Sequence, residues 1–246
     1  MPPNKKSKSL GAKPPAGAQS AKAAPNWPVF SPLIPEADLA LEQVLPEQIV
    51  TIPNFWTSTL CKSYVSFLSS LPLTTTPGKP KKGDAVRVND RYQIDDPAFA
   101  ERLWSETSLK SIIEAQPKEL WGGDVVGLNP NIRIYRYSKG QFFDQHYDDF
   151  NNVTLRGTPS IQARTTWTLL LYLTSPATGC IGGETVFYPD PPKKKSREPL
   201  PEPVVVGLEV GMALLHRHGV DCMLHEGREV LEGEKWVIRS DLCVKR

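Results

Sequence analysis

The chain contains only four histidines, and one of them lies in an arrangement that suits metal binding. A single residue, Tyr147, separates His146 from Asp148. In an extended strand, side chains at positions i and i+2 project from the same face, so this imidazole and this carboxylate can converge on one point. A second imidazole from another strand would complete a two-histidine, one-carboxylate ligand set, the arrangement that leaves coordination positions open on non-haem Fe(II).

The best candidate for the second imidazole is His225, which is followed by a β-branched segment that begins at Lys235. Lys235, Val237 and Arg239 alternate onto one face of this predicted strand. If that face points inward, two cations are buried, and a buried charge requires an acidic partner. The segment therefore predicts that an acidic ligand binds near His225.

Other candidate ligands are less well placed. His216 and His218 follow an apolar run and have no downstream lysine, so we interpret them as core or rim residues of a strand. Asp144 and Asp149 flank the His146–Asp148 pair, and we interpret them as loop residues or as neighbours of the ligands rather than as ligands.

Helical patterns occupy the first half of the chain. Thr57 or Ser58 can cap a helix that presents one apolar stripe and ends at Pro72. Further helices are predicted at 96–107 and 109–115, with a short helix at 38–44 and a strand at 48–52. These elements form the predicted helical support, residues 36–120.

From Asp124 onward, short β-branched and aromatic runs alternate with Gly, Pro and Asn. Strands without intervening helices indicate an antiparallel sandwich or barrel, so the predicted fold is mainly β, with a barrel core over 124–246. The runs are 131–137, 165–173, 185–188, 203–206, 212–216, 219–224 and 234–244.

Composition restricts the location and partners of the protein. Residues 1–35 contain five lysines and no acid, and they are rich in Pro and Ala, which predicts a disordered basic tail. The remaining 24 basic and 27 acidic residues have a net charge of −3, so nucleic acid is not an expected partner. No apolar run could span a membrane or serve as a secretory signal, so we expect an intracellular protein, cytoplasmic or nuclear.

These motifs together resemble the 2-oxoglutarate- and Fe(II)-dependent dioxygenases of the prolyl 4-hydroxylase type, particularly their small soluble fungal members. The resemblance covers roughly residues 85–246 and implies a double-stranded β-helix, or jelly-roll, barrel. It depends on the order and spacing of five segments: Tyr135–Gln141, His146–Asp148, Trp167–Leu173, Gly182–Phe187, and His225 with Lys235.

The resemblance implies roles for individual residues. His146, Asp148 and His225 would be the iron ligands. Lys235 would bind the distal carboxylate of 2-oxoglutarate. The remaining cosubstrate residues would be Tyr137 and Tyr172, which would line that pocket, and Arg239, whose guanidinium is also suited to binding the carboxylate. The sequence leaves the choice between Lys235 and Arg239 open.

The implied activity is hydroxylation of a prolyl or proline-like residue in a protein or peptide, with release of succinate and CO2. It would require Fe(II), 2-oxoglutarate and O2, with ascorbate as reductant. Alternatives are a hydroxylase of a free amino acid or small metabolite, and a non-catalytic barrel that serves as a binding or sensor module. Nucleobase demethylation is disfavoured because the segment after His225 lacks paired arginines. The oligomeric state is not predicted.

A polar segment at residues 78–92 precedes the barrel, where prolyl hydroxylases place a mobile lid. The resemblance therefore implies that Arg91 and Tyr92 contact the substrate.

Overall fold

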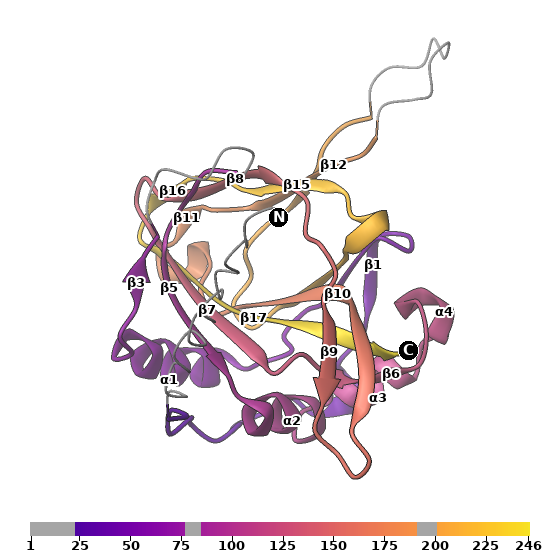
Figure 1. Cartoon of the computed structure of the whole chain (residues 1–246). Helices are drawn as coiled ribbons and strands as arrows, with labels where there is room; N and C mark the ends of the chain where they lie inside the picture. Colours follow the sequence, from indigo (N-terminus) through magenta and orange to yellow (C-terminus); the bar gives the residue numbers. More distant parts are fainter. Residues whose placement is uncertain (1–22, 77–84, 191–200) are drawn as a thin grey trace, which may run out of the picture.

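The structure, a computed structural model, describes residues 23–76, 85–190 and 201–246, and these residues form mainly antiparallel strands (Figure 1). Predictions that concern residues 1–22, 77–84 and 191–200 lie outside the described residues. They include most of the basic tail and part of the predicted lid. Among the described residues, no helix has the length and hydrophobicity needed to cross a bilayer.

The helices of the described chain are short. The α-helices are α1 (Ser58–Ser69), α2 (Pro97–Ser105), α3 (Leu109–Glu114) and α4 (Lys118–Trp121). The 3-10 helices are η1 (Glu36–Asp38), η2 (Pro176–Thr178) and η3 (Gly219–Asp221). As predicted, the Thr57 side chain caps α1 by accepting a hydrogen bond of 3.1 Å from the Leu60 amide.

The larger sheet is built on two long strands, β10 and β17. Its strands in spatial order are β1 (Glu42–Leu45), β2 (Ile49–Ile52), β14 (Ala213–Arg217), β10 (Ile161–Tyr172), β17 (Glu234–Lys245), β7 (Asn131–Ser138), β5 (Asp90–Asp95) and β3 (Thr74–Thr75). Two further strands pair outside this path: β6 (Val125–Leu128) with β17 and β9 (Asn152–Leu155) with β10.

The smaller sheet carries the histidine segments. Its order is β13 (Val204–Val206), β12 (Thr185–Tyr188), β15 (Leu224–Gly227), β8 (Phe142–His146) and β4 (Arg87–Val88). A separate pair joins β11 (Ile181–Gly182) to β16 (Val230–Glu232). All these pairings are antiparallel, as expected for strands that follow one another without crossover helices.

Alternation along β17 separates two apolar cores. Trp236 and Ile238 pack with residues of α1, α2 and α3 in one core, which lies where these helices cover the large sheet (Figure 1). Val237 packs in a second core with Tyr172 and Phe187, which belong to the larger and smaller sheets respectively. Side chains of β17 that share the face of Val237 therefore point into the space between the two sheets.

Order begins before the predicted boundary at residue 36. Trp27 and Phe30 are buried in the helical core, and the Trp27 indole donates a hydrogen bond of 2.7 Å to Asp96. Residues 23–35 therefore do not belong to a disordered tail. The Pro- and Ala-rich composition obscured the fact that two aromatic rings supply enough apolar surface to hold this segment.

Two predicted elements differ from the structure. The predicted helix at 38–44 is replaced by η1 and by β1, which pairs with β2; a seven-residue helix is marginal, whereas the sheet edge offers hydrogen bonds. The predicted strand at 219–224 is η3, because the chain must turn from β14 in one sheet to β15 in the other.

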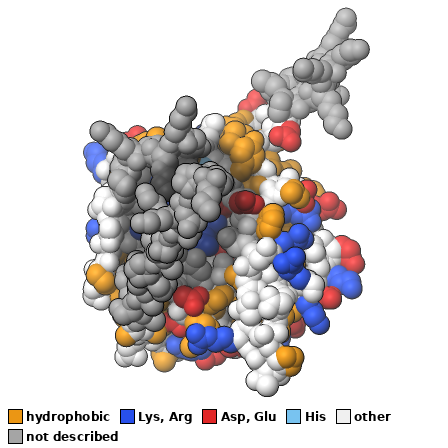
Figure 2. Space-filling model, viewed as in Figure 1, with side chains coloured by type: hydrophobic (Ala, Val, Ile, Leu, Met, Phe, Trp, Pro, Cys, Tyr) orange, Lys and Arg blue, Asp and Glu red, His pale blue; other side chains and the backbone are white. Residues whose placement is uncertain are grey.

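Charged side chains of both signs are interspersed over the described part of the face that Figure 2 shows. No extended surface of one sign is visible there.

Gly211 offers a test of the turn that leads into β14. Its φ is +81°, and an added Cβ would overlap the carbonyl oxygen of Trp56. We expect Gly211→Ala to lower the free energy of unfolding by about 2–5 kcal/mol, because strain at positive φ adds to a backbone clash. Gly140, with φ +82° and open space around it, is the matched control, and Gly140→Ala should cost only about 1–2 kcal/mol. Urea unfolding measures both, and equal losses would contradict the clash.

Candidate metal centre

The predicted triad comes together in a pocket between the two sheets. His146 ends β8, His225 lies on β15, and the two residues are direct cross-strand partners. Asp148 follows two residues after the end of β8, and all three side chains line the same pocket. The i+2 spacing thus brings His146 and Asp148 together although the strand itself stops at His146.

A β-bulge in β8 directs His146 into this pocket. His225 and Gly227, two positions apart on β15, pair with His146 and Phe143, which are three positions apart on β8. The extra residue places Phe143 and His146 on one side, where their rings stack with centroids 3.5 Å apart. The bulge therefore determines the orientation of this imidazole.

The Asp148 backbone is held by the turn at η3. Its amide donates a hydrogen bond of 3.2 Å to the Cys222 thiol, and its carbonyl accepts one of 2.9 Å from the Gly219 amide. The carboxylate accepts a further hydrogen bond of 3.0 Å from Thr168 of β10. A residue outside any strand thus has a defined position.

The three ligand atoms face one another at distances that a single ion can span. Nε2 of His146 lies 3.7 Å from Oδ1 of Asp148, and Nε2 of His225 lies 3.7 Å from Oδ2. All ligand atoms of the triad lie within 4.8 Å of one another. Nδ1 of His146 lies 2.8 Å from the Asp144 carbonyl oxygen, and Nδ1 of His225 lies 2.9 Å from that of Met223. These contacts assign the proton of each ring to Nδ1 and leave Nε2 free to bind metal.

The charge states also fit a divalent cation. Burial and the neighbouring His225 lower the pKa of His146 to about 3, and burial likewise lowers the pKa of His225. Burial alone would raise the pKa of Asp148, but the Arg239 guanidinium holds it well below its usual value. Two neutral imidazoles and one ionised carboxylate, open on one side, are the donor set that suits Fe(II).

Arg239 lies at this centre and binds the ligand carboxylate. Its guanidinium contacts both Asp148 oxygens, at 3.2 Å from Nη1 and 2.9 Å from Nη2. Nε of Arg239 lies 3.5 Å from Oδ1 of a second carboxylate, Asp241. Asp241 also forms an ion pair with Arg133 at 3.1 Å and accepts a hydrogen bond of 2.8 Å from the Asn129 side chain. A chain of alternating buried charges therefore runs from the candidate metal site into the barrel wall.

Lys235 lies in the same pocket but has no carboxylate partner within 4.0 Å among the described residues. Its Nζ donates a hydrogen bond of 2.7 Å to the Gly183 carbonyl and lies 5.5 Å and 5.3 Å from the ring centroids of Tyr137 and Tyr172. Burial lowers the pKa of Lys235 to about 8. The Tyr172 hydroxyl is already engaged with Thr185 at 2.6 Å, whereas Tyr137 lines the pocket.

His216 also lines the pocket, although its position after an apolar run favoured a core or rim residue. It is buried as expected for a core residue, but its Nε2 lies 3.8 Å from Oδ2 of Asp148. It could have been found from the alternation of β14, because Leu214 two positions earlier belongs to the core between the sheets. His218, two positions later, does not line this pocket, and its ring nitrogens lie 2.9 Å from the hydroxyls of Thr165 and Thr168.

The structure does not bring Arg91 or Tyr92 into the pocket. Tyr92 is buried in the helical core, and the exposed end of Arg91 bonds Gln93. Among the described residues of this segment, Arg87 on β4 lines the pocket. Strand alternation could not identify it, because β4 is only two residues long.

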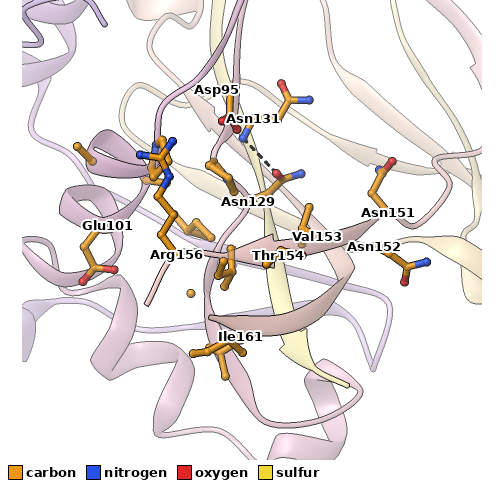
Figure 3. Close-up of a pocket in the computed structure, with 18 residues that line it drawn as sticks. Asp95, Glu101, Asn129, Asn131, Asn151, Asn152, Val153, Thr154, Arg156 and Ile161 are labelled. Carbon is orange, nitrogen blue, oxygen red and sulfur yellow. Dashed lines mark hydrogen bonds between the residues drawn. The ribbon is translucent and has the colours of Figure 1, made fainter. Parts of the chain in front are cut away.

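A larger cleft, of about 830 Å³, lies elsewhere, where α2, the β6–β7 connection and the β9–β10 hairpin meet (Figure 3). It is lined by polar side chains that include Asn129, Asn131 and Arg156, and none of the predicted site residues is among them. Size alone therefore does not identify the site, because the metal-ligating chemistry lies in the smaller pocket.

A model of the 2OG-Fe(II) oxygenase superfamily matches residues 132–240, which include the triad, Lys235 and Arg239. A search of curated proteins found no significant match to the sequence.

Three solved structures are similar in fold. A Pseudomonas putida prolyl-4-hydroxylase is 14% identical, with 81% of this chain and 94% of that chain covered and a TM-score of 0.55. A Trichoplax adhaerens prolyl hydroxylase, in complex with a hypoxia inducible factor peptide, is 15% identical (80% and 84% covered, TM-score 0.54). HygX from Streptomyces hygroscopicus, with nickel, 2-oxoglutarate and hygromycin B bound, is 18% identical (80% and 83% covered, TM-score 0.52).

At sequence identities this low, the similarity to these structures is a similarity of fold. It confirms the predicted fold class, a mainly β jelly-roll barrel with supporting helices. The superfamily match covers the segment that carries the candidate metal ligands and both buried cations. Residues 132–240 of the chain therefore resemble the 2OG-Fe(II) oxygenase superfamily, and the chain as a whole shares the fold of solved prolyl hydroxylases.

Proposed function

We propose that the protein is an Fe(II)- and 2-oxoglutarate-dependent dioxygenase of the small prolyl 4-hydroxylase-like type. It would hydroxylate a prolyl or proline-like residue in a protein or peptide and release succinate and CO2. The observation that carries this proposal is the meeting of His146, Asp148 and His225 in a pocket that also holds Lys235, a buried cation with no acidic partner among the described residues.

Each residue has a role in this proposal. His146, Asp148 and His225 would hold Fe(II), which would supply the redox centre for activating O2, the oxidant of the hydroxylation. Lys235 would bind the distal carboxylate of 2-oxoglutarate, and Tyr137 would form part of the wall beside it. Arg239 is already paired with Asp148, so we assign it to holding the ligand carboxylate rather than to the cosubstrate.

The prolyl substrate is supported by the fold neighbours that are prolyl hydroxylases. The test is incubation of the full chain with Fe(II), 2-oxoglutarate, O2, ascorbate and a panel of proline-containing peptides, with free amino acids as a parallel arm. Succinate release and a mass gain of one oxygen atom on a peptide would support the proposal. Oxygen on free amino acids alone would favour a small-molecule hydroxylase. No succinate in any arm would favour a binding module.

The role of Lys235 predicts how cosubstrate binding depends on pH. Because burial lowers its pKa to about 8, Lys235 is protonated below that pH and loses its charge above it. A dianion binds the protonated form, so the Kd of 2-oxoglutarate should be flat below about pH 8 and rise by up to about tenfold per unit above it. Calorimetry on anaerobic, Fe(II)-loaded protein measures this dependence.

Lys235→Arg provides the control, because a guanidinium stays protonated throughout this range. We expect the variant to bind 2-oxoglutarate with a Kd that is flat over the same pH range. An equally steep rise in the variant would assign the pH dependence to another group.

A further inference from the structure

Arg87 places a positive charge at the wall of the candidate metal pocket. It lies on β4 directly opposite Phe143 of β8, and its guanidinium carbon is 3.6 Å from the centroid of the Phe143 ring. The same ring stacks on His146, so Arg87 is separated from a candidate metal ligand by one aromatic ring. Its distance to the centroid of Tyr135, another pocket residue, is 5.1 Å.

Within the described chain, this guanidinium has no acidic partner. No carboxylate lies within 4.0 Å of it, and its Nε is buried without a hydrogen-bond acceptor. The two acidic side chains that line the same pocket in the described part of the chain are already engaged: Asp148 by Arg239 at 2.9 Å, and Glu226 by the Tyr188 hydroxyl at 2.7 Å. A buried donor on a cation without a partner is costly unless a ligand supplies the acceptor.

Neither the metal nor the cosubstrate accounts for this charge. Under the proposed function, the triad binds the metal and Lys235 takes the distal carboxylate, while the metal itself attracts the other carboxylate of 2-oxoglutarate. Lys235 and Arg239 are deeply buried, at 5% and 8% exposure, whereas Arg87 is only partly buried. Of the described cations that line the pocket, Arg87 is thus the most exposed to solvent, where a primary substrate would enter.

We propose that Arg87 determines substrate specificity by binding a carboxylate of the primary substrate. The inference rests on the proposed function and adds a substrate class to it: molecules with an acidic group close to the hydroxylated position. In a peptide this group is an Asp or Glu side chain beside the target residue, and in a free amino acid it is the α-carboxylate. A guanidinium can bind either one through two parallel hydrogen bonds.

A purely structural role for Arg87, in which it only packs on Phe143 and so steadies His146, makes different predictions. The variants separate the two roles because Arg87→Met keeps an apolar side chain over the ring, whereas Arg87→Glu reverses the charge. Arg91→Ala is the matched control, since Arg91 belongs to the same segment but lies outside the pocket.

The experiment measures binding of proline peptides to anaerobic protein loaded with Fe(II) and 2-oxoglutarate. The end-blocked peptides carry Glu, Gln or Lys beside the proline, and N-acetylproline is compared with its amide to test the α-carboxylate. We expect wild-type protein and Arg91→Ala to prefer the acidic member of a pair by about 10- to 100-fold. Arg87→Met should lose the preference, and Arg87→Glu should prefer the Lys peptide. The Kd of 2-oxoglutarate should change less than about twofold in every variant, within the error of such comparisons.

The proposal is overturned if no acidic preference exists, if it survives in Arg87→Met, or if Arg87→Glu fails to reverse it. A preference for the Glu peptide would show that Arg87 binds an acidic side chain beside the proline. A preference for N-acetylproline over its amide, without a preference among the peptides, would show that Arg87 binds the α-carboxylate. Failure of the proposed function is recognised separately, because oxygen incorporation and succinate would then be absent while the charge preference in binding remained.

Discussion

Replacing His146, Asp148 or His225 with alanine should abolish 2-oxoglutarate turnover and reduce Fe(II) affinity by more than about 100-fold. Losses of 10- to 100-fold follow the removal of groups that merely orient a metal ligand, so removal of a ligand itself should exceed them. Each of these residues supplies an atom that faces the other two within 4.8 Å. Metal content after dialysis and succinate formation are the measurements.

His216→Ala is the control for this prediction. His216 is buried and its Nε2 lies 3.8 Å from Oδ2 of Asp148, but it is not part of the His146–Asp148–His225 triad. The variant should keep its metal, and circular dichroism should confirm that all four variants are folded. If His216→Ala lost the metal while His146→Ala retained it, the metal ligand would be His216 and not His146.

Replacing Arg239 with methionine should destabilise the metal-free protein by about 3–5 kcal/mol, because a buried carboxylate loses its counter-charge. Arg239 contacts both oxygens of Asp148, whereas Asp241 would keep Arg133 and Asn129 as partners. The loss of stability should therefore come mainly from the unpaired Asp148 carboxylate. Urea unfolding with chelator present gives the stability.

The double variant Arg239→Met/Asp148→Asn isolates the pair. We expect it to be more stable than Arg239→Met alone, since the unpaired charge is gone, and added metal should restore stability only to variants that retain Asp148. Strictly additive costs would show that the two side chains are not coupled.

The pair also predicts a direction with pH. The folded-state pKa of Asp148 is lowered, so its contribution to stability is present above about pH 4, the usual carboxyl value, and is lost as pH falls through the lower folded-state value. Arg239→Met should lack this acid-side loss. A wild-type curve that is flat below the usual carboxyl value would contradict the lowered pKa.

Local sequence patterns predicted those elements whose stability is mostly local. The apolar stripe and the Thr57 cap specify α1, and the β-branched alternation after Lys235 specifies β17. The predictions that were wrong concern segments whose structure depends on contacts with residues far away in the sequence. Residues 42–45 are a strand because β2 lies beside them, and Trp27 is ordered because Asp96 and Phe99 meet it.

The same division applies to the pocket. Residue types and the i+2 rule were sufficient to select His146 and Asp148, and the spacing of His225 and Lys235 indicated which distant imidazole joins them. Whether Arg239 or Lys235 remained available for a carboxylate was not decidable from sequence, because both share one face of β17. Only the tertiary structure shows that Arg239 is already paired with Asp148, which leaves Lys235 available.

By itself, then, the sequence determined the chemical identity of the candidate ligands and the mainly β class of the domain, since both follow from residue types and short-range periodicity. The tertiary structure decided the cross-strand register of His146 with His225, the bulge that turns His146 inward, and the placement of Arg87 beside Phe143. Each of these depends on which strands lie side by side, and pairing between residues far apart in the chain is a property of the whole fold.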